Sequence, residues 1–252
     1  MEQALWFGWF RADIVAEYGQ LFWHGLQMTM LVTVICIVQG TGLGLLLGMA
    51  RLAEARHAPA RQACRYLLRC PATVYVSFFR GTPLFVQLLL MHFAVLPLFI
   101  NPADGLLVAG EAARNLKQNY GAFLSGVAAL TLNAGAYISE VFRAGIQSID
   151  RGQYEGAKVL GFSYGQTMRR IVLPQVVKRI LPPMSNETIT LVKDTSLIYV
   201  LALNDLLRAA RGIVQRDFTI TPFIVAAAFY LIMTLVLTWL FQRLEKRHAV
   251  YD

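Results

Sequence analysis

The sequence has little charge and few cysteines. Of its 252 residues only 15% are charged and 56% are hydrophobic, and the mean hydropathy is +0.50. Soluble domains carry about 25% charged residues on average, so this composition argues against a soluble enzyme and indicates a protein of the lipid bilayer. The three cysteines have no histidines at the spacing of a zinc site, and we expect no metal site.

The sequence also lacks the motifs by which enzymes hold nucleotides or activate nucleophiles. Nothing resembles G-x-x-x-x-G-K-[ST], and no Gly-Lys pair occurs anywhere. No Ser-His-Asp arrangement is evident, because the histidines are scattered along the chain. We therefore expect that this chain is not an enzyme and holds no cofactor of its own.

Long apolar runs are the main feature that is present. Four of them are long enough to cross a hydrocarbon core of about 30 Å, and a fifth is weaker because it carries Glu187, Lys193 and Asp194. We predict an all-α integral membrane protein, with a single transmembrane domain over residues 1–252. The predicted spans are residues 24–50, 73–100, 120–142, 186–203 and 222–241.

The distribution of basic residues sets the expected orientation. Most Lys and Arg residues outside the spans follow the first, the third and the last span. Cytoplasmic segments hold such an excess, and five spans place all three segments on one side, whereas four would not. We expect the N-terminus outside and the C-terminus inside. Since the net charge of +8 lies where topology requires it, we expect no nucleic-acid partner.

A small-residue face runs along the first span. Gly40, Gly44 and Gly48 repeat every four residues, a spacing suited to close helix packing in membranes. We expect another helix to pack there.

The predicted cytoplasmic loop, residues 150–175, contains an interrupted helical stretch. Glu155 and Ala157 lie near its start, Gly161 follows, and Pro174 lies near its end. Because glycine commonly ends a helix, we expect a short amphipathic helix that stops at Gly161. One interpretation is a helix that docks into a groove of a partner; another is a helix that lies on lipid.

The stretch resembles the EAA loop of ABC-importer permeases, E-A-A-x3-G-x9-I-x-L-P, with every spacing kept and Gly156 in place of the middle Ala. In that family the loop is a coupling helix that docks on the ATPase subunit. The resemblance implies an ATPase-coupling segment at Glu155, Gly156, Ala157, Gly161 and Pro174. Glycine inside a helix costs about 0.5–1 kcal/mol relative to alanine, so we expect a softer helix or a closer backbone approach here.

Three further stretches resemble the signature segments of the polar amino-acid permeases, the histidine, glutamine, arginine and glutamate group of ABC importers. They are FFRGTPLFVQLLL (78–90), NAGAYISEVFRAGIQSI (133–149) and SNETITLVKDTSLIYVLALNDLL (185–207). The resemblance implies the type I importer fold, with five transmembrane helices per subunit, in the bacterial inner membrane. Residues 100–119 are a longer outer connection, which some members for acidic amino acids share.

The resemblance also implies a function and its partners. The function is import of a polar L-amino acid by alternating access. The partners are a second permease subunit, identical or similar, two ATPase subunits that bind ATP and Mg, a periplasmic solute-binding protein and membrane lipid.

A candidate substrate site lies in the weakest span. Glu187, Thr190 and Asp194 are spaced i, i+3 and i+7, so they share one helix face with the two carboxylates about 10 Å apart along the axis. Carboxylates accept hydrogen bonds from an α-ammonium group. The resemblance places the acidic residue of the segment that contains Asn186 and Glu187 against the bound amino acid.

Other segments supply the remaining candidate groups. Donors to the substrate carboxylate could come from Thr82, from the backbone around Gly81, or from Arg80. Glu140 is a further candidate, although its spacing from Arg143 favours an ion pair between those two.

Alternatives remain for the two carboxylates and for the function. Asp194 could form an internal ion pair with Lys193 or Arg80, and Glu187 could be a carboxylate that stabilises a helix N-terminus. The alternative functions are a membrane signalling protein coupled to an ATPase without transport, an importer of another small polar solute, and a proton-coupled carrier. We find no inverted repeat of the kind that many such carriers contain.

Overall fold

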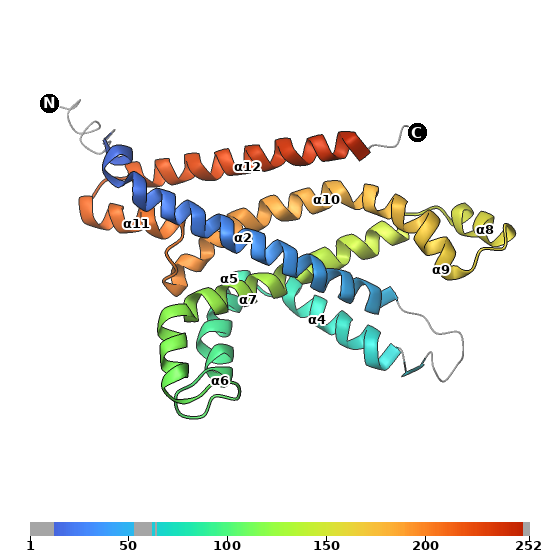
Figure 1. Cartoon of the computed structure of the whole chain (residues 1–252), viewed down its shortest axis with the longest axis horizontal. Coiled ribbons are helices and arrows are strands. Elements are labelled where there is room, and N and C mark those ends of the chain that lie inside the picture. Colours follow the sequence, from blue (N-terminus) through green and yellow to red (C-terminus); the bar gives the residue numbers. More distant parts are fainter. Residues whose placement is uncertain (1–12, 53–61, 64, 249–252) are drawn as a thin grey trace. The chain divides into compact units, whose positions relative to one another are not determined.

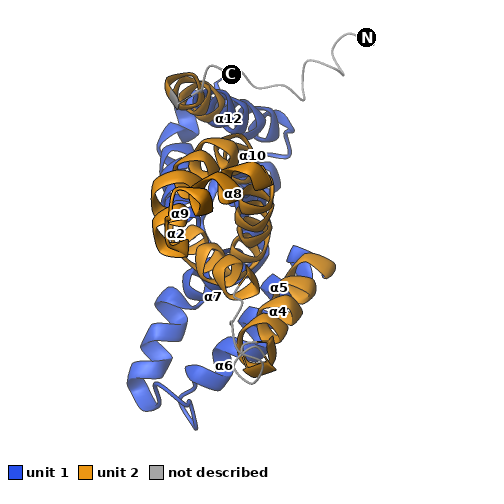
Figure 2. Ribbon diagram, turned by 90° about the vertical axis from the view of Figure 1, so that its right-hand side faces the viewer, with its two compact units in different colours: residues 1–37, 82–131, 189–236 blue, residues 38–81, 132–188, 237–252 orange. Residues whose placement is uncertain are grey.

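The computed structural model describes residues 13–52, 62–63 and 65–248, and in these residues it is almost wholly helical. The helices group into two compact units, each built from three separate stretches of chain, which Figure 2 colours differently. Unit 1 comprises residues 1–37, 82–131 and 189–236, and unit 2 comprises residues 38–81, 132–188 and 237–252.

Figure 1 labels the α-helices in chain order. They are α2 (Ile14–Leu52), α4 (Cys70–Gly81), α5 (Leu84–Leu90), α6 (Leu96–Phe99), α7 (Gly110–Gln147), α8 (Arg151–Val159), α9 (Tyr164–Thr167), α10 (Leu173–Asp194), α11 (Leu206–Asp217) and α12 (Thr221–His248). Three π-helical segments and one 3₁₀ segment join some of them, namely η1 (Arg65–Arg69), η2 (Met91–Val95), η3 (Met168–Val172) and η4 (Thr195–Leu201).

Three of the described helices, α2, α7 and α12, are long and apolar enough to cross a membrane. A fourth span is added if the helices on either side of the break at Thr82 and Pro83 count as one. These four correspond to the predicted spans 24–50, 73–100, 120–142 and 222–241. The fifth predicted span falls on the end of α10 and on η4, and it stays a prediction.

The outer connection predicted over residues 100–119 is partly helical. Its second half belongs to α7, which begins at Gly110. Turns and an isolated bridge between Ile100 and Val108 fill the preceding residues. Gly110 has a φ of +69°, a conformation that glycine adopts without strain, so the chain turns there and enters the helix at once.

In unit 1 the first halves of α2 and α12 run parallel and lie side by side. The Tyr18 hydroxyl of α2 donates over 2.8 Å to the carboxylate of Asp217, the last residue of α11, which lies four residues before α12 begins. The rings of Phe22 of α2 and Phe229 of α12 stack with centroids 6.1 Å apart. The later residue of α2 therefore contacts the later residue of the C-terminal segment, which means that α2 and α12 run in the same direction. Both helices begin at the same end of the unit.

In unit 2 small residues bring three helices close together. A Cβ at Gly44 of α2 would lie 2.7 Å from the Ile138 side chain of α7, and a Cβ at Gly145 of α7 would lie 2.3 Å from Ile180 of α10. Any larger residue would force the backbones apart. The predicted packing role of the Gly44 face is confirmed, and its partner is α7.

Candidate functional sites: the coupling loop and a charged pocket

The loop after α7 is an interrupted helix whose start is capped. The Asp150 side chain accepts a hydrogen bond from the backbone N–H of Gly152 over 2.6 Å. This satisfies one of the donors that every helix start leaves open. The helix that follows, α8, has nine residues.

The end of α8 has the geometry that the sequence predicts. Gly161 has a φ of +76°, its N–H donates to the Lys158 carbonyl, and the N–H of Phe162 donates to the Ala157 carbonyl, both over 3.0 Å. These two bonds are the Schellman pattern of helix termination. The predicted stop at Gly161 is confirmed.

A second helical run starts directly after this turn. Ser163 and Gln166 form a reciprocal capping box, in which each side chain accepts from the other residue's backbone N–H. The run passes through α9 and η3 into α10, where Pro174 is the second residue. Proline has no backbone N–H to donate. The π-helical segment η3 ends at Val172, two residues before Pro174. Figure 1 shows α8 and α9 as the short helices between α7 and α10.

One side of α8 is anchored and its C-terminal end is apolar and exposed. Ala157 is buried, and Tyr154 packs on the core formed by Ile149, Val172, Val176 and Ile180. By contrast, Val159 is 87% exposed, Leu160 73% and Tyr164 67%. Such side chains at a turn are a suitable plug for a groove of a partner protein.

The predicted coupling residues therefore play different parts. Glu155 and Gly156 lie on the exposed surface of α8, Ala157 holds the helix to its own subunit, and Gly161 makes the turn. A Cβ at Gly156 would meet nothing within 4 Å. Among the residues that the structure describes, then, no contact requires a glycine at that position.

A charged pocket of about 420 Å³ lies in the same unit. Its charged lining comes from three helices, with Arg80 at the end of α4, Glu140 on α7, and Arg179 and Glu187 on α10. The ring of Tyr137, on α7, completes one wall. Opposite charges from separated segments thus surround one concave volume, which suits a zwitterionic ligand.

Glu140 is the most densely paired of these groups. Its carboxylate lies 2.5 Å from the Arg51 guanidinium at the end of α2, 2.7 Å from Arg143 and 3.4 Å from Arg80. The predicted pair with Arg143 is confirmed, but two further arginines share the carboxylate. Because its negative charge is already neutralised, we assign Glu140 to holding the helices together instead of binding an ammonium group.

Arg80 keeps donors available for a ligand. Its guanidinium lies 5.3 Å from the centre of the Tyr137 ring, and its contact with Glu140 is the longest of the three. A guanidinium has five N–H donors in a fixed fork, so these contacts leave most of them for another acceptor. Arg80 and Glu187 line the same pocket, one as a hydrogen-bond donor and one as an acceptor.

Arg179 joins the pocket to the coupling loop. Its guanidinium donates to the backbone carbonyl of Ser148 and, over 3.2 Å, to the Ser148 hydroxyl. Ser148 itself lines the pocket and lies two residues before the Asp150 cap of α8. The side chain of Arg179 therefore connects the pocket to the segment that leads into α8.

The other predicted site residues lie elsewhere. Asn186 is exposed and does not line the pocket. Thr82 and Asp194 belong to unit 1. The Thr82 hydroxyl and carbonyl accept from the Gln87 amide over 2.8 and 3.0 Å. Asp194, the last residue of α10, forms no salt bridge within the described residues, so the alternative of an internal ion pair with Lys193 is not supported there.

Sequence reasoning missed Arg51 and Arg179 as site residues. Arg51 was assigned only to the basic segment after the first span, yet it lies three residues after Gly48. Since positions i and i+3 share a helix face, the glycine spacing already pointed Arg51 towards α7. No comparable signal marks Arg179, because its partner lies 31 residues away.

Comparison with models of protein families shows to which family the chain belongs. Residues 66–250 match the family described as "Binding-protein-dependent transport system inner membrane component". The chain belongs to this family. The matched region contains the coupling loop and most of the helices that line the charged pocket.

Characterised relatives agree with the assignment to this family of transport components. The chain is 32% identical to the glutamine transport system permease protein GlnP of Escherichia coli K12 over 90% of this chain and 92% of the relative. It is 33% identical to the arginine transport system permease protein ArtQ of Bacillus subtilis 168 over 89% and 90%.

Solved structures agree as well. A crystal structure of an amino acid ABC transporter with histidines matches with a TM-score of 0.74 and 32% identity, over 94% of this chain and 100% of that one. The MetNI methionine ABC transporter matches with a TM-score of 0.67 and 16% identity, over 96% and 100%, which supports the fold alone.

Proposed function

We propose that this chain is the permease subunit of an ATP-driven importer that moves a polar L-amino acid across the bacterial inner membrane. The observation that carries the proposal is α8, an anchored helix with an apolar exposed end, in a chain that has no phosphate-binding loop. The relatives named for glutamine and arginine transport support an amino acid as the solute.

The mechanism is alternating access driven by the ATPase. ATP and Mg bind to two partner ATPase subunits, which receive the α8 end in a groove, and a second permease subunit completes the pathway. A periplasmic binding protein delivers the solute. When the ATPase subunits close, the displacement of α8 passes through Ser148 and Arg179 to the wall of the charged pocket.

The residues proposed to hold the solute are Arg80 and Glu187. The guanidinium of Arg80 donates to the α-carboxylate and the carboxylate of Glu187 accepts from the α-ammonium, both as charge-assisted hydrogen bonds. Thr82 remains a proposed donor to the α-carboxylate, and Asn186 and Asp194 remain proposed substrate-binding residues. The contacts of the described residues give none of the three a particular role.

The proposed orientation has five spans with the N-terminus outside and the C-terminus inside. Parallel helices at the two ends of a chain require an odd number of crossings. The parallel α2 and α12 of unit 1 therefore favour five spans over four. This orientation places the coupling loop in the cytoplasm, where ATP is available.

Uptake into proteoliposomes tests the proposal. Vesicles would hold the purified permease with its ATPase and binding protein, and each polar amino acid would be added in turn. We expect accumulation of at least one amino acid that needs ATP and continues when the proton gradient is dissipated. ATP hydrolysis without accumulation would support signalling, and accumulation driven by a proton gradient without ATP would support a carrier; either result contradicts the proposal. Accumulation of only another polar solute would overturn the substrate class.

A further inference from the structure

A second pocket, of about 800 Å³, lies in unit 1 between the beginning of α2 and the connection from η4 to α11. Its polar lining consists of His24, Tyr199, Asn204, Arg208, Arg211 and Gln215. None of the residues that line it is acidic. This pocket shares no residue with the charged pocket of unit 2.

Arg208 and Arg211 lie on α11, and the beginning of α11 packs closely against α2. The Asp205 carboxylate caps α11 by accepting from the Arg208 N–H over 3.0 Å. Gly25 of α2 lies directly beneath, since a Cβ there would be 2.9 Å from the Leu206 Cα. The Leu206 N–H donates to the Thr29 hydroxyl over 3.3 Å. The pocket is thus formed without any ligand.

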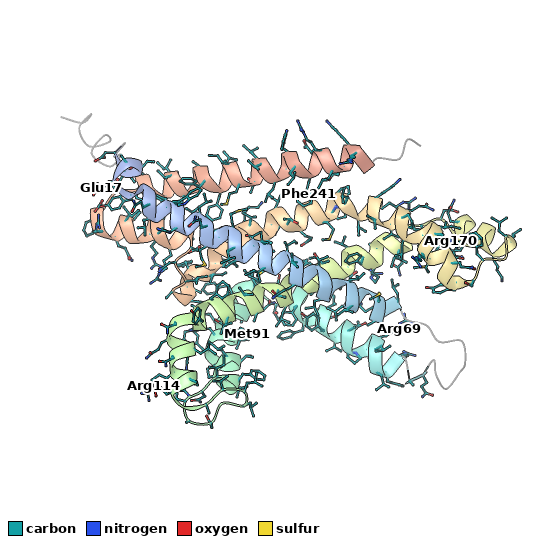
Figure 3. All side chains as sticks on the ribbon, viewed as in Figure 1. Glu17, Arg69, Met91, Arg114, Arg170 and Phe241 are labelled. Atoms are coloured by element: carbon teal, nitrogen blue, oxygen red, sulfur yellow. The ribbon has the colours of Figure 1, made fainter. Side chains whose placement is uncertain are left out.

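Arg208 and Arg211 line the pocket, and the Asp205 carboxylate, whose charge interacts with that of Arg208, does not line it. Arg208 donates to the Asn204 side chain over 3.1 Å, and the Arg211 guanidinium lies 5.1 Å from the centre of the Tyr199 ring. Neither forms an ion pair with a side chain in the described residues. On the same helix Arg216 is paired with Glu17 over 3.6 Å and with Asp217 over 3.2 Å. Figure 3 labels Glu17 near the start of α2.

The pocket lies where two candidate spans begin. Because α2 and α12 start at the same end of unit 1, the α11 that precedes α12 lies at a membrane surface. Large apolar side chains are exposed around it: Leu21 is 44% exposed, Trp23 56%, Phe218 87% and Ile220 49%. Exposed tryptophan and other large apolar residues at helix ends are typical of the bilayer interface.

We propose that this pocket binds the phosphodiester head group of an anionic phospholipid. Two guanidinium groups offer the planar, multi-donor geometry that phosphate oxygens accept. Asn204 and Gln215 can donate to or accept from the hydroxyl groups of a glycerol head group. The acyl chains lie against the exposed apolar surface beside the pocket. The proposal requires a membrane location but no particular solute.

Lipid retention by the purified protein tests the proposal. The full chain would be incubated in detergent with phosphatidylglycerol and phosphatidylcholine of identical acyl chains, and bound lipid counted by native mass spectrometry. We expect preferential retention of phosphatidylglycerol. The double variant Arg208→Gln/Arg211→Gln should lose about tenfold in that preference, because charge-assisted hydrogen bonds are removed. Arg216→Gln, a paired arginine on the same helix, should leave the preference unchanged.

Three outcomes would overturn the proposal. Equal retention of the two lipids would show that the charge is not recognised, and an equal loss in Arg216→Gln would show general surface attraction. Displacement of the lipid by glycerol phosphate at equal concentration would identify a free phosphate as the ligand.

A further experiment tests whether the ligand is a protein instead of a lipid. If the double variant retains lipid as the wild type does but no longer binds the periplasmic binding protein, the pocket recognises acidic side chains and the lipid assignment is wrong. The variant Arg208→Lys/Arg211→Lys guards against misfolding, since it keeps the charges and should retain part of the preference.

Discussion

Arg179 of α10 holds Ser148, the residue next after α7, through hydrogen bonds to both its backbone carbonyl and its hydroxyl. The first of these bonds is accepted by the backbone carbonyl of Ser148, so it would form whatever the side chain at position 148. The guanidinium of Arg179 therefore links the pocket wall to the start of α8, in addition to the packing of Tyr154 on α10.

This contact gives the first prediction. Arg179→Gln removes the charged donor, so ATP hydrolysis should continue while amino-acid uptake per ATP falls severalfold. Ser148→Ala is the matched control, because it keeps the carbonyl acceptor and should lower coupling much less. The measurement is the ratio of uptake to hydrolysis in proteoliposomes. An unchanged ratio in Arg179→Gln would remove this contact from the coupling path.

The turn at Gly161 gives the second prediction. Valine at a φ of +76° costs about 1–2 kcal/mol and would redirect the exposed end of α8. Gly161→Val should insert normally yet bind less ATPase in a pull-down from membranes. Gly156→Ala is the control: its Cβ would meet none of the described residues within 4 Å, and the substitution should stabilise α8 by about 0.5–1 kcal/mol. If both variants bind ATPase as the wild type does, the turn is irrelevant to docking.

The Arg51–Glu140 pair gives the third prediction. Both side chains are largely buried. Glu140→Gln removes the counter-charge of Arg51, whereas Arg51→Gln leaves Glu140 paired with Arg143 and Arg80. A double-mutant cycle with Arg51→Gln and Glu140→Gln should show a coupling energy of about 1–3 kcal/mol in the thermal stability of the purified protein. Additive effects of the two substitutions would contradict the structural role of this pair.

Solute binding gives the fourth prediction. Glu187→Gln should weaken binding of every transported amino acid alike by about 1–3 kcal/mol, because each has the same α-ammonium group. If Asp194 has a structural role instead of a ligand role, Asp194→Asn should lower the yield of assembled complex and leave the affinity unchanged. Binding to the purified complex without its binding protein, together with that yield, checks both. Normal affinity and normal assembly in Glu187→Gln would leave Glu187 without a ligand role.

Asp205 gives the fifth prediction, which concerns pH. It lies outside the predicted spans, and burial raises the pKa of its carboxyl from 3.8 to about 6. Between about pH 4 and pH 6 the unfolded chain has lost this proton and the folded chain retains it. The free energy of unfolding should therefore fall over that range, by at most about 3 kcal/mol from this group, and level off above it.

The variant Asp205→Asn isolates this effect. Asparagine caps helices about as well as aspartate but cannot ionise. Thermal unfolding between pH 4 and pH 8 should show a smaller fall for the variant and a higher stability at pH 7. The same pH dependence in both proteins would mean that Asp205 ionises in the folded state as it does in the unfolded one.

Much of the coupling loop could be predicted from the sequence, because its geometry is local. The turn at Gly161 depends only on the positive φ of this glycine and on two hydrogen bonds to the preceding helical turn. The spacing between Glu155 and Gly161 in the sequence is therefore enough to predict where the helix ends. The apolar spans were predictable for a similar reason, since bilayer thickness sets their length.

The charged pocket could be predicted only in part. Glu140 binds Arg143 three residues away, which the helix period indicates, but it also binds Arg51, 89 residues earlier. That contact exists because small residues such as Gly44 let α2 approach α7, and the approach sets which charges meet. The packing of the helices therefore determines which charged residues line the pocket, and the spacing of charged residues in the sequence does not predict that packing.

The most direct test of the account is a cysteine cross-link between α8 and the ATPase. The native Cys36, Cys64 and Cys70 would first be replaced, and cysteine introduced at Val159, with the equally exposed Phe218 as control. We expect Val159→Cys to cross-link to the ATPase subunit in native membranes, with a yield that changes when ATP is added, and Phe218→Cys not to cross-link. No cross-link from Val159→Cys, or an equal yield from Phe218→Cys, would contradict the assignment of α8 as the coupling helix.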